Sequence, residues 1–100
     1  MTIELEIRDR LIKAALNDGY SISVNDGEET TVVKSTDTDE IAAATRSTDE
    51  DYLIFFNSHG IKAGWVWLIW GNGRDLISDA SDNRATSALI DTIIEWTNQW

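Results

Sequence analysis

The chain has 100 residues, 42% of them hydrophobic, and a formal net charge of -10 at pH 7. This length suits a single domain over residues 1–100, and the hydrophobic content excludes a disordered chain. Because the sequence contains no cysteine, disulfide bonds, thiolate metal sites and a cysteine nucleophile are excluded. Glu4 and Glu6 lie near the first residue, where a signal peptide carries basic residues. No apolar run is long enough to span a membrane. We therefore expect a cytoplasmic protein.

Residues 3–17 have apolar side chains at helical spacing and predict an amphipathic helix. Its two apolar stripes are Ile3, Ile7, Leu11 and Ala14, and Leu5, Ile12 and Leu16. Two stripes indicate burial on two sides, either within the domain or against a second copy of the chain. The second stripe is therefore a candidate oligomer interface. Glu4 and Arg8 are four residues apart on one side of this helix, a spacing at which they can pair.

Five short runs that alternate in hydrophobicity or are rich in β-branched and aromatic residues predict strands. They lie near residues 20–24, 30–34, 52–56, 65–70 and 76–79. Capping residues in 35–40 begin a short helix that ends by Arg46. A final helix is expected to start at Asp82 or Asn83 and to run to Trp100.

Asn72-Gly73 is the strongest hairpin signal, because a two-residue type I′ turn needs positive φ at both positions. This turn would pair Ile69 with Leu76, Leu68 with Ile77 and Trp67 with Ser78. One face of the hairpin would then carry Trp65, Trp67, Ile69 and Leu76, and the other Val66, Leu68, Trp70 and Ile77. Both faces are apolar, so Trp65, Trp67 and Trp70 are further candidate interface residues.

The order α-β-β-α-β-β-β-α predicts an α+β fold, in which an antiparallel five-stranded meander has its helices packed mainly on one face. Three helices are too few to cover both faces of such a sheet. We therefore expect one sheet face to meet a second copy in a homodimer.

Acidic residues are concentrated between positions 26 and 51, where only Lys34 and Arg46 are basic. The nine acids are Asp26, Glu28, Glu29, Asp37, Asp39, Glu40, Asp49, Glu50 and Asp51. This charge disfavours direct binding to nucleic acid and favours a basic protein partner. The alternative is a solvated surface that only keeps the protein soluble.

The sequence offers no convincing catalytic, metal-binding or cofactor-binding pattern. His59, the only histidine, lies in an expected turn without a recognisable nucleophile or orienting partner. Asp37-Thr38-Asp39 begins like a calcium loop but lacks its later ligands, and Asp75, Asp79 and Asp82 straddle a strand end and a helix start. Gly71-Asn72-Gly73 lacks the lysine and helix of a phosphate-binding loop. We therefore expect no catalytic activity, no metal and no cofactor.

The hairpin segment Trp70-Gly71-Asn72-Gly73-Arg74-Asp75-Leu76-Ile77-Ser78-Asp79 resembles a Tyr-Gly-Asn-x-Gly-x-Asp-Val-Ile-x-Asp pattern of small bacteriophage proteins of uncharacterised function. The resemblance extends to residues 26–29, 34–37 and 47–51, about half of the chain, and departs from the pattern at Trp70. It implies phage or prophage origin and transfers no functional residues.

Two functions remain open. One is a small acidic binding protein that inhibits a host nucleic-acid-handling or defence protein by presenting carboxylates where phosphates normally lie. The other is a homo-oligomeric structural or assembly protein whose acidity serves only solubility.

Overall fold

The computed structural model describes residues 2–99, which form three α-helices and a five-stranded antiparallel sheet in the order α-β-β-α-β-β-β-α. The predicted α+β fold is confirmed. The helices are α1 (Ile3–Asn17), α2 (Thr38–Ala44) and α3 (Arg84–Thr97), and a short 3-10 helix, η1, covers Gly73–Asp75. The strands are β1 (Ser21–Asn25), β2 (Thr30–Ser35), β3 (Glu50–Phe56), β4 (Lys62–Ile69) and β5 (Ile77–Ala80). The expected end of the last helix at Trp100 lies outside the described residues.

Each α-helix begins at a side chain that accepts hydrogen bonds from the first turn. The Thr2 hydroxyl accepts from the Leu5 amide, and the Asn83 side chain accepts from the Thr86 amide. The Asp37 carboxylate accepts from two amides at the start of α2. These contacts satisfy main-chain N–H groups that have no partner within the helix. They confirm Asn83 as the cap of the last helix.

The strand order is β2-β1-β3-β4-β5, so the expected simple meander is wrong. In a meander β3 would pair with β2, whereas it pairs with β1. The difference arises at α2, which packs on β1 and β2 and carries the chain across both strands to the free edge of β1. From β3 onward, consecutive strands are neighbours.

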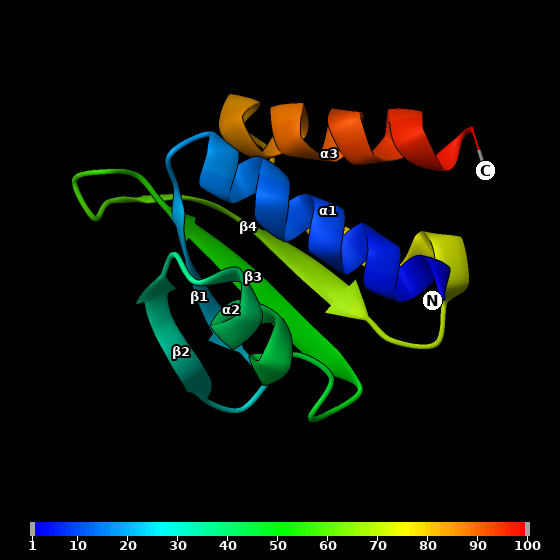
Figure 1. The fold of residues 1–100 in the computed structure, drawn as a ribbon, viewed down its shortest axis with the longest axis horizontal. Coiled ribbons are helices and arrows are strands. Elements are labelled where there is room, and N and C mark those ends of the chain that lie inside the picture. Colours follow the sequence, from blue (N-terminus) through cyan, green and yellow to red (C-terminus); the bar gives the residue numbers. More distant parts are fainter. Residues whose placement is uncertain (1, 100) are drawn as a thin grey trace.

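The helices lie on one face of the sheet, with α1 and α2 packed over the strands and α3 alongside α1 (Figure 1). Residues of both apolar stripes of α1 pack within the domain. Ile12 is completely buried in the core and Leu16 packs against it, so these two residues leave the candidate oligomer interface. Leu5 is half-buried.

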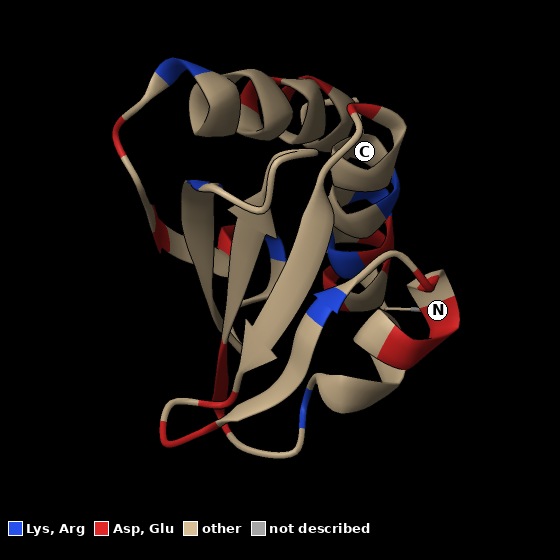
Figure 2. Ribbon diagram, turned by 90° about the vertical axis from the view of Figure 1, so that its left-hand side faces the viewer, with Lys and Arg blue, Asp and Glu red and all other residues tan. Residues whose placement is uncertain are grey.

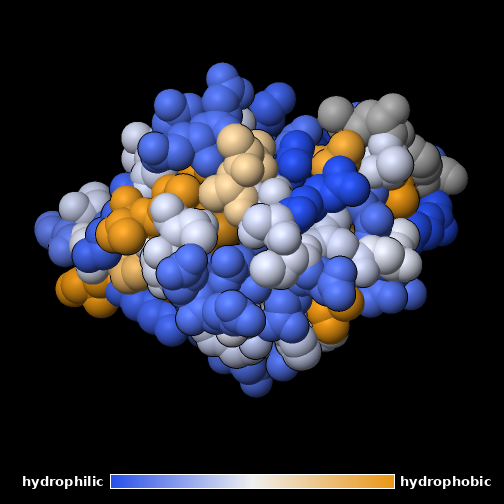
Figure 3. Space-filling model, turned by 90° about the horizontal axis from the view of Figure 1, so that it is seen from below, coloured by the Kyte–Doolittle hydropathy of each residue, from blue (hydrophilic) through white to orange (hydrophobic). Residues whose placement is uncertain are grey.

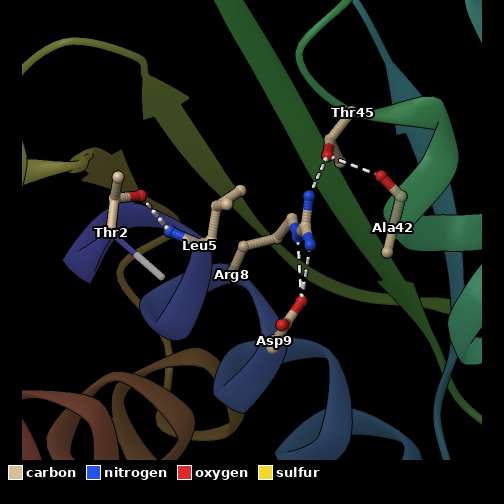
Figure 4. Close-up of polar contacts among 6 residues, drawn as sticks. All are labelled: Thr2, Leu5, Arg8, Asp9, Ala42 and Thr45. Carbon is tan, nitrogen blue, oxygen red and sulfur yellow. Dashed lines mark hydrogen bonds and ion pairs between the residues drawn. The ribbon is translucent and has the colours of Figure 1, made fainter.

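Arg8 joins α1 to the end of α2, and the spacing that would let it pair with Glu4 is not used. Its guanidinium contacts the Asp9 carboxylate at 2.9 Å and donates to the Thr45 hydroxyl at 3.3 Å (Figure 4). The Thr45 hydroxyl in turn donates to the Ala42 carbonyl at 2.8 Å. The contact holds the short α2 helix against α1.

The connection between β4 and β5 is longer than the predicted two-residue turn. Asn72 has a φ of -99°, whereas Gly71 and Gly73 have φ values of 100° and 60°. The amides of residues 71, 72 and 73 all donate to one carboxylate oxygen of Glu4, at 2.7, 3.1 and 3.3 Å. Successive main-chain N–H groups that converge in this way form an anion-binding nest. The expected turn type is therefore wrong, because Glu4 organises a wider loop.

The register of the β4–β5 hairpin agrees with the expectation only in part. Leu68 lies opposite Ile77 as expected, but an irregularity in the pairing places Asp79, not Ser78, opposite Trp67. The wider loop also turns Leu76 into the core, away from the face that carries Trp67. Among the described residues, no helix is long and apolar enough to cross a membrane.

Candidate functional site

Two segments that are far apart in sequence meet at one end of the sheet. The Thr48 hydroxyl lies 2.7 Å from the main-chain oxygen of Asp26 and 2.8 Å from that of Glu50. Gly27 has a φ of 100°, and a Cβ atom there would lie 2.7 Å from the Glu50 carboxylate. The glycine therefore allows the β1–β2 turn to approach the start of β3.

This contact creates a carboxylate cluster, which we call the acidic end; it consists of Asp26, Glu28, Glu29, Asp49 and Glu50. Four of these residues, together with Gly27 and Thr48, line a hollow of about 330 Å³. Acidic residues are seen at the lower end of the sheet in Figure 2. The amides of Glu28 and Glu29 each donate to Asp26 at 2.9 Å, which lowers the pKa of that carboxyl and keeps it ionised.

The other acids of the predicted surface have different positions. Asp37 is the N-cap of α2, and Asp39 and Glu40 lie in its first turn, where negative charge stabilises the helix. Asp51 is completely buried, so its expected place on the acidic surface is wrong. The alternation of β3 explains this, because Asp51 shares the core-facing side with Leu53.

The buried Asp51 carboxylate is hydrogen-bonded to groups within the domain. One carboxylate oxygen accepts from the Arg46 amide and the Trp70 indole N–H, each at 2.8 Å. The other oxygen has no hydrogen-bond partner among the described residues. Burial raises the pKa of Asp51, and the two donated hydrogen bonds oppose that shift.

The sheet face opposite the helices is aromatic; this surface, called the open face, consists of Tyr52, Ile54, Phe56, Trp65 and Trp67. All five side chains are half-buried. The Tyr52 ring stacks on Trp67 with centroids 5.7 Å apart, and meets Trp65 edge-on at 6.2 Å. Two of the three predicted interface tryptophans therefore lie side by side on this face.

Trp70 lies elsewhere. It packs against the core, donates to Asp51, and is covered by the Arg46 guanidinium at 5.3 Å from its ring centroid. These contacts satisfy the indole within the domain, so Trp70 leaves the candidate interface.

The two ends of the sheet differ in charge. Lys34 Nζ lies 4.8 Å from the centroid of the Phe56 ring, and Lys62 is paired with Phe56 in the sheet register. The acidic end lies at the opposite ends of these strands, where Glu50 pairs with Ile69. Along the strand direction, the open face therefore runs from basic to acidic.

His59 lies exposed in the β3–β4 turn, as its sequence context predicts, and its amide donates to the Asn57 side chain. In the part of the chain that the structure describes, no group of three or more His, Cys, Asp or Glu residues is arranged to hold a metal ion. What the described geometry offers is a surface for electrostatic and apolar contacts. Comparisons with protein-family models, curated proteins and solved structures found no match for this chain.

Proposed function

We propose that this protein is a non-catalytic binding domain that engages a basic protein surface through its acidic end. The observation that carries the proposal is the meeting of two acidic segments, Asp26–Glu29 and Asp49–Glu50, around one hollow. Hydrogen bonds and strand pairing fix the main chain of both segments to the sheet, so the positions from which their carboxylates project are set before binding. A preorganised charge array loses little conformational freedom on association.

The partner class follows from the charge. A protein whose basic surface normally holds nucleic acid presents Lys and Arg side chains spaced for phosphates. Fixed carboxylates can occupy such a surface and exclude the nucleic acid. Together with the resemblance to phage proteins, this points to a host enzyme that cuts, copies or guards DNA, with the host cytoplasm as the place of action.

The proposal is tested by capture from a bacterial host lysate on the immobilised protein over a salt series. We expect a captured protein that elutes steeply with rising salt, since screening weakens exposed charge pairs. Duplex DNA should compete with the immobilised protein for the same partner. A captured protein that DNA does not displace, or whose retention is independent of salt, would contradict the proposal.

A second candidate is a homodimer through the open face. Five half-buried aromatic and aliphatic side chains lie on the side of the sheet away from all the described helices. Two copies related by a two-fold axis that is perpendicular to the strands, in the plane of the contact, would place the Lys34 end of one face on the acidic end of the other, which is a self-complementary arrangement. On the side of the molecule seen in Figure 3, hydrophobic residues form separate patches in a mainly hydrophilic surface.

Light scattering checks the homodimer directly. We expect a mass of about twice 11.2 kDa for the native protein at micromolar-to-millimolar concentration. Trp65→Lys should halve that mass, because the introduced charge would be buried in the contact. A native mass near 11.2 kDa throughout the concentration range would rule the dimer out.

A further inference from the structure

A cleft of about 470 Å³ lies between α3 and β5, the strand at one edge of the sheet. α3 packs on α1 and β4, so its outer side diverges from β5. Small side chains on the two walls, Ser78 and Ser81 on one and Ser87 on the other, leave the space between them unfilled. The volume is in the range of natural ligand sites, which is about 300–1,000 Å³.

The interior of this cleft is aliphatic. Ile77 lines the strand wall, and Ile90 and Ile94 line the helix wall. Ile94 is 49% exposed, so its aliphatic surface is accessible from the cleft. An apolar group placed between these walls would remove aliphatic surface from water on both sides.

The rim of the cleft is acidic. Among the described residues that line it, the charged ones are Asp75, Asp79, Asp82 and Asp91 against Arg74. The Arg74 guanidinium donates to the Thr97 carbonyl at 3.1 Å, at one end of the cleft. Asp91 lies on the α3 wall and Asp82 in the β5–α3 connection, so a cation at the rim meets negative charge from both segments. Asp79 is paired with Trp67 and shares its face of the sheet.

We propose that this cleft binds a short basic segment of a partner protein, with an aliphatic side chain between the isoleucines and the flanking Lys or Arg side chains against the rim aspartates. The charge complementarity selects this occupant over a second copy of the chain, whose net charge is also -10. Nucleic acid is disfavoured for the same reason. The cleft shares no lining residue with the acidic end, so the two sites can be tested separately.

The test is a titration of the ¹⁵N-labelled protein with the peptide acetyl-Lys-Ile-Lys-Ile-Lys-amide, followed by NMR. We expect chemical-shift changes confined to β5, the β5–α3 connection and the outer side of α3. A matched peptide in which both isoleucines are replaced by serine keeps the charge and should bind at least about five-fold more weakly, since it lacks the apolar contact.

Two cleft variants and one control make the result specific. Asp82→Asn with Asp91→Asn should weaken binding of the isoleucine peptide by about five-fold. Glu28→Gln with Asp49→Asn removes the same charge at the acidic end and should change binding less than about two-fold. Ile94→Ser alters an exposed helix position and should weaken the isoleucine peptide but not the serine peptide. Equal binding of the two peptides, or equal weakening by the cleft and control pairs, would overturn the proposal.

Discussion

Asp51 is a carboxylic acid inside an apolar core, and its environment makes stability depend on pH. Its pKa in the folded protein is raised above the ordinary value of 3.8, mainly because burial disfavours the charged form. The fold therefore prefers the protonated acid. Its contribution to the free energy of unfolding is largest below the unfolded pKa and falls as pH rises through the folded pKa.

Asp51→Asn should remove this dependence. The amide oxygen can still accept from Arg46 and Trp70, while the charge that burial penalises is gone. We expect the difference in unfolding free energy, variant minus wild type, to increase between about pH 3 and pH 7. Urea denaturation at several pH values measures this difference, in which the other titrating groups cancel. A difference that does not change with pH would contradict the assignment of the shift to Asp51.

Gly64 is required by close packing, since it is buried where the start of α3 approaches β4. A Cβ atom would overlap the Thr86 hydroxyl and lie 2.8 Å from the Ser81 hydroxyl. Those two hydroxyls are 2.7 Å apart and hydrogen-bonded, so neither can move away freely.

Gly64→Ala should destabilise the protein by about 1–3 kcal/mol through overpacking. Chemical denaturation measures the loss, and a double-mutant cycle with Thr86→Ala identifies its origin. Because the second change removes the overlapping hydroxyl, the combined loss should be smaller than the sum of the two single losses. Additive losses would show that the overlap is not the cause.

At the scale of elements, the loop between β4 and β5 shows what sequence reasoning missed. Asn72-Gly73 correctly marked a reversal, but Glu4 lies nearly seventy residues away and supplies the acceptor that shapes it. Local turn preference cannot anticipate a distant carboxylate. The only local signal was the pair of glycines around Asn72, which a nest also uses.

Glu4→Gln should cost about 1 kcal/mol, because three amides lose a charged acceptor. Glu6→Gln is the matched control in the same helical turn, with a surface contact to Arg10 at 3.6 Å and an expected cost of about 0.5 kcal/mol or less. Thermal or urea unfolding compares the two. Equal losses would show that the nest contributes nothing beyond general charge.

Gly73→Val and Asn72→Ala separate the observed loop from a type I′ turn. Gly73 has a φ of 60°, so valine there should cost about 1–3 kcal/mol. Asn72 has an ordinary φ of -99° and keeps its amide in the variant, so alanine should change stability by less than about 0.5 kcal/mol. A large loss from Asn72→Ala would instead favour the turn predicted from sequence.

Other elements followed directly from the sequence. Apolar periodicity and capping residues predicted the helices, and alternation predicted the strands, because these are local properties. The pairing of β3 with β1 was missed, since strand order depends on where α2 packs. Composition predicted an acidic surface between residues 26 and 51, but not which of its residues lie together. Only the structure shows that Asp51 points into the core and that Asp37, Asp39 and Glu40 lie separately at the start of α2.

At the scale of the whole molecule, negative charge is distributed unevenly over a stable scaffold. The helices cover one sheet face, the other face is aromatic, and carboxylates gather at one end of the strands. Repulsion between carboxylates held together at the acidic end destabilises the folded state. In this account the charge serves binding, and the acidic end is its central element.

The most direct test compares capture from host lysate by the native protein and by a variant with Glu28→Gln, Glu29→Gln, Asp49→Asn and Glu50→Gln. A control with Asp18→Asn, Asp39→Asn, Glu40→Gln and Glu95→Gln removes the same charge elsewhere, and circular dichroism verifies that both variants fold. We predict that the acidic-end variant loses the salt-sensitive partner, while the control retains it. Undiminished capture by a folded acidic-end variant would contradict the account.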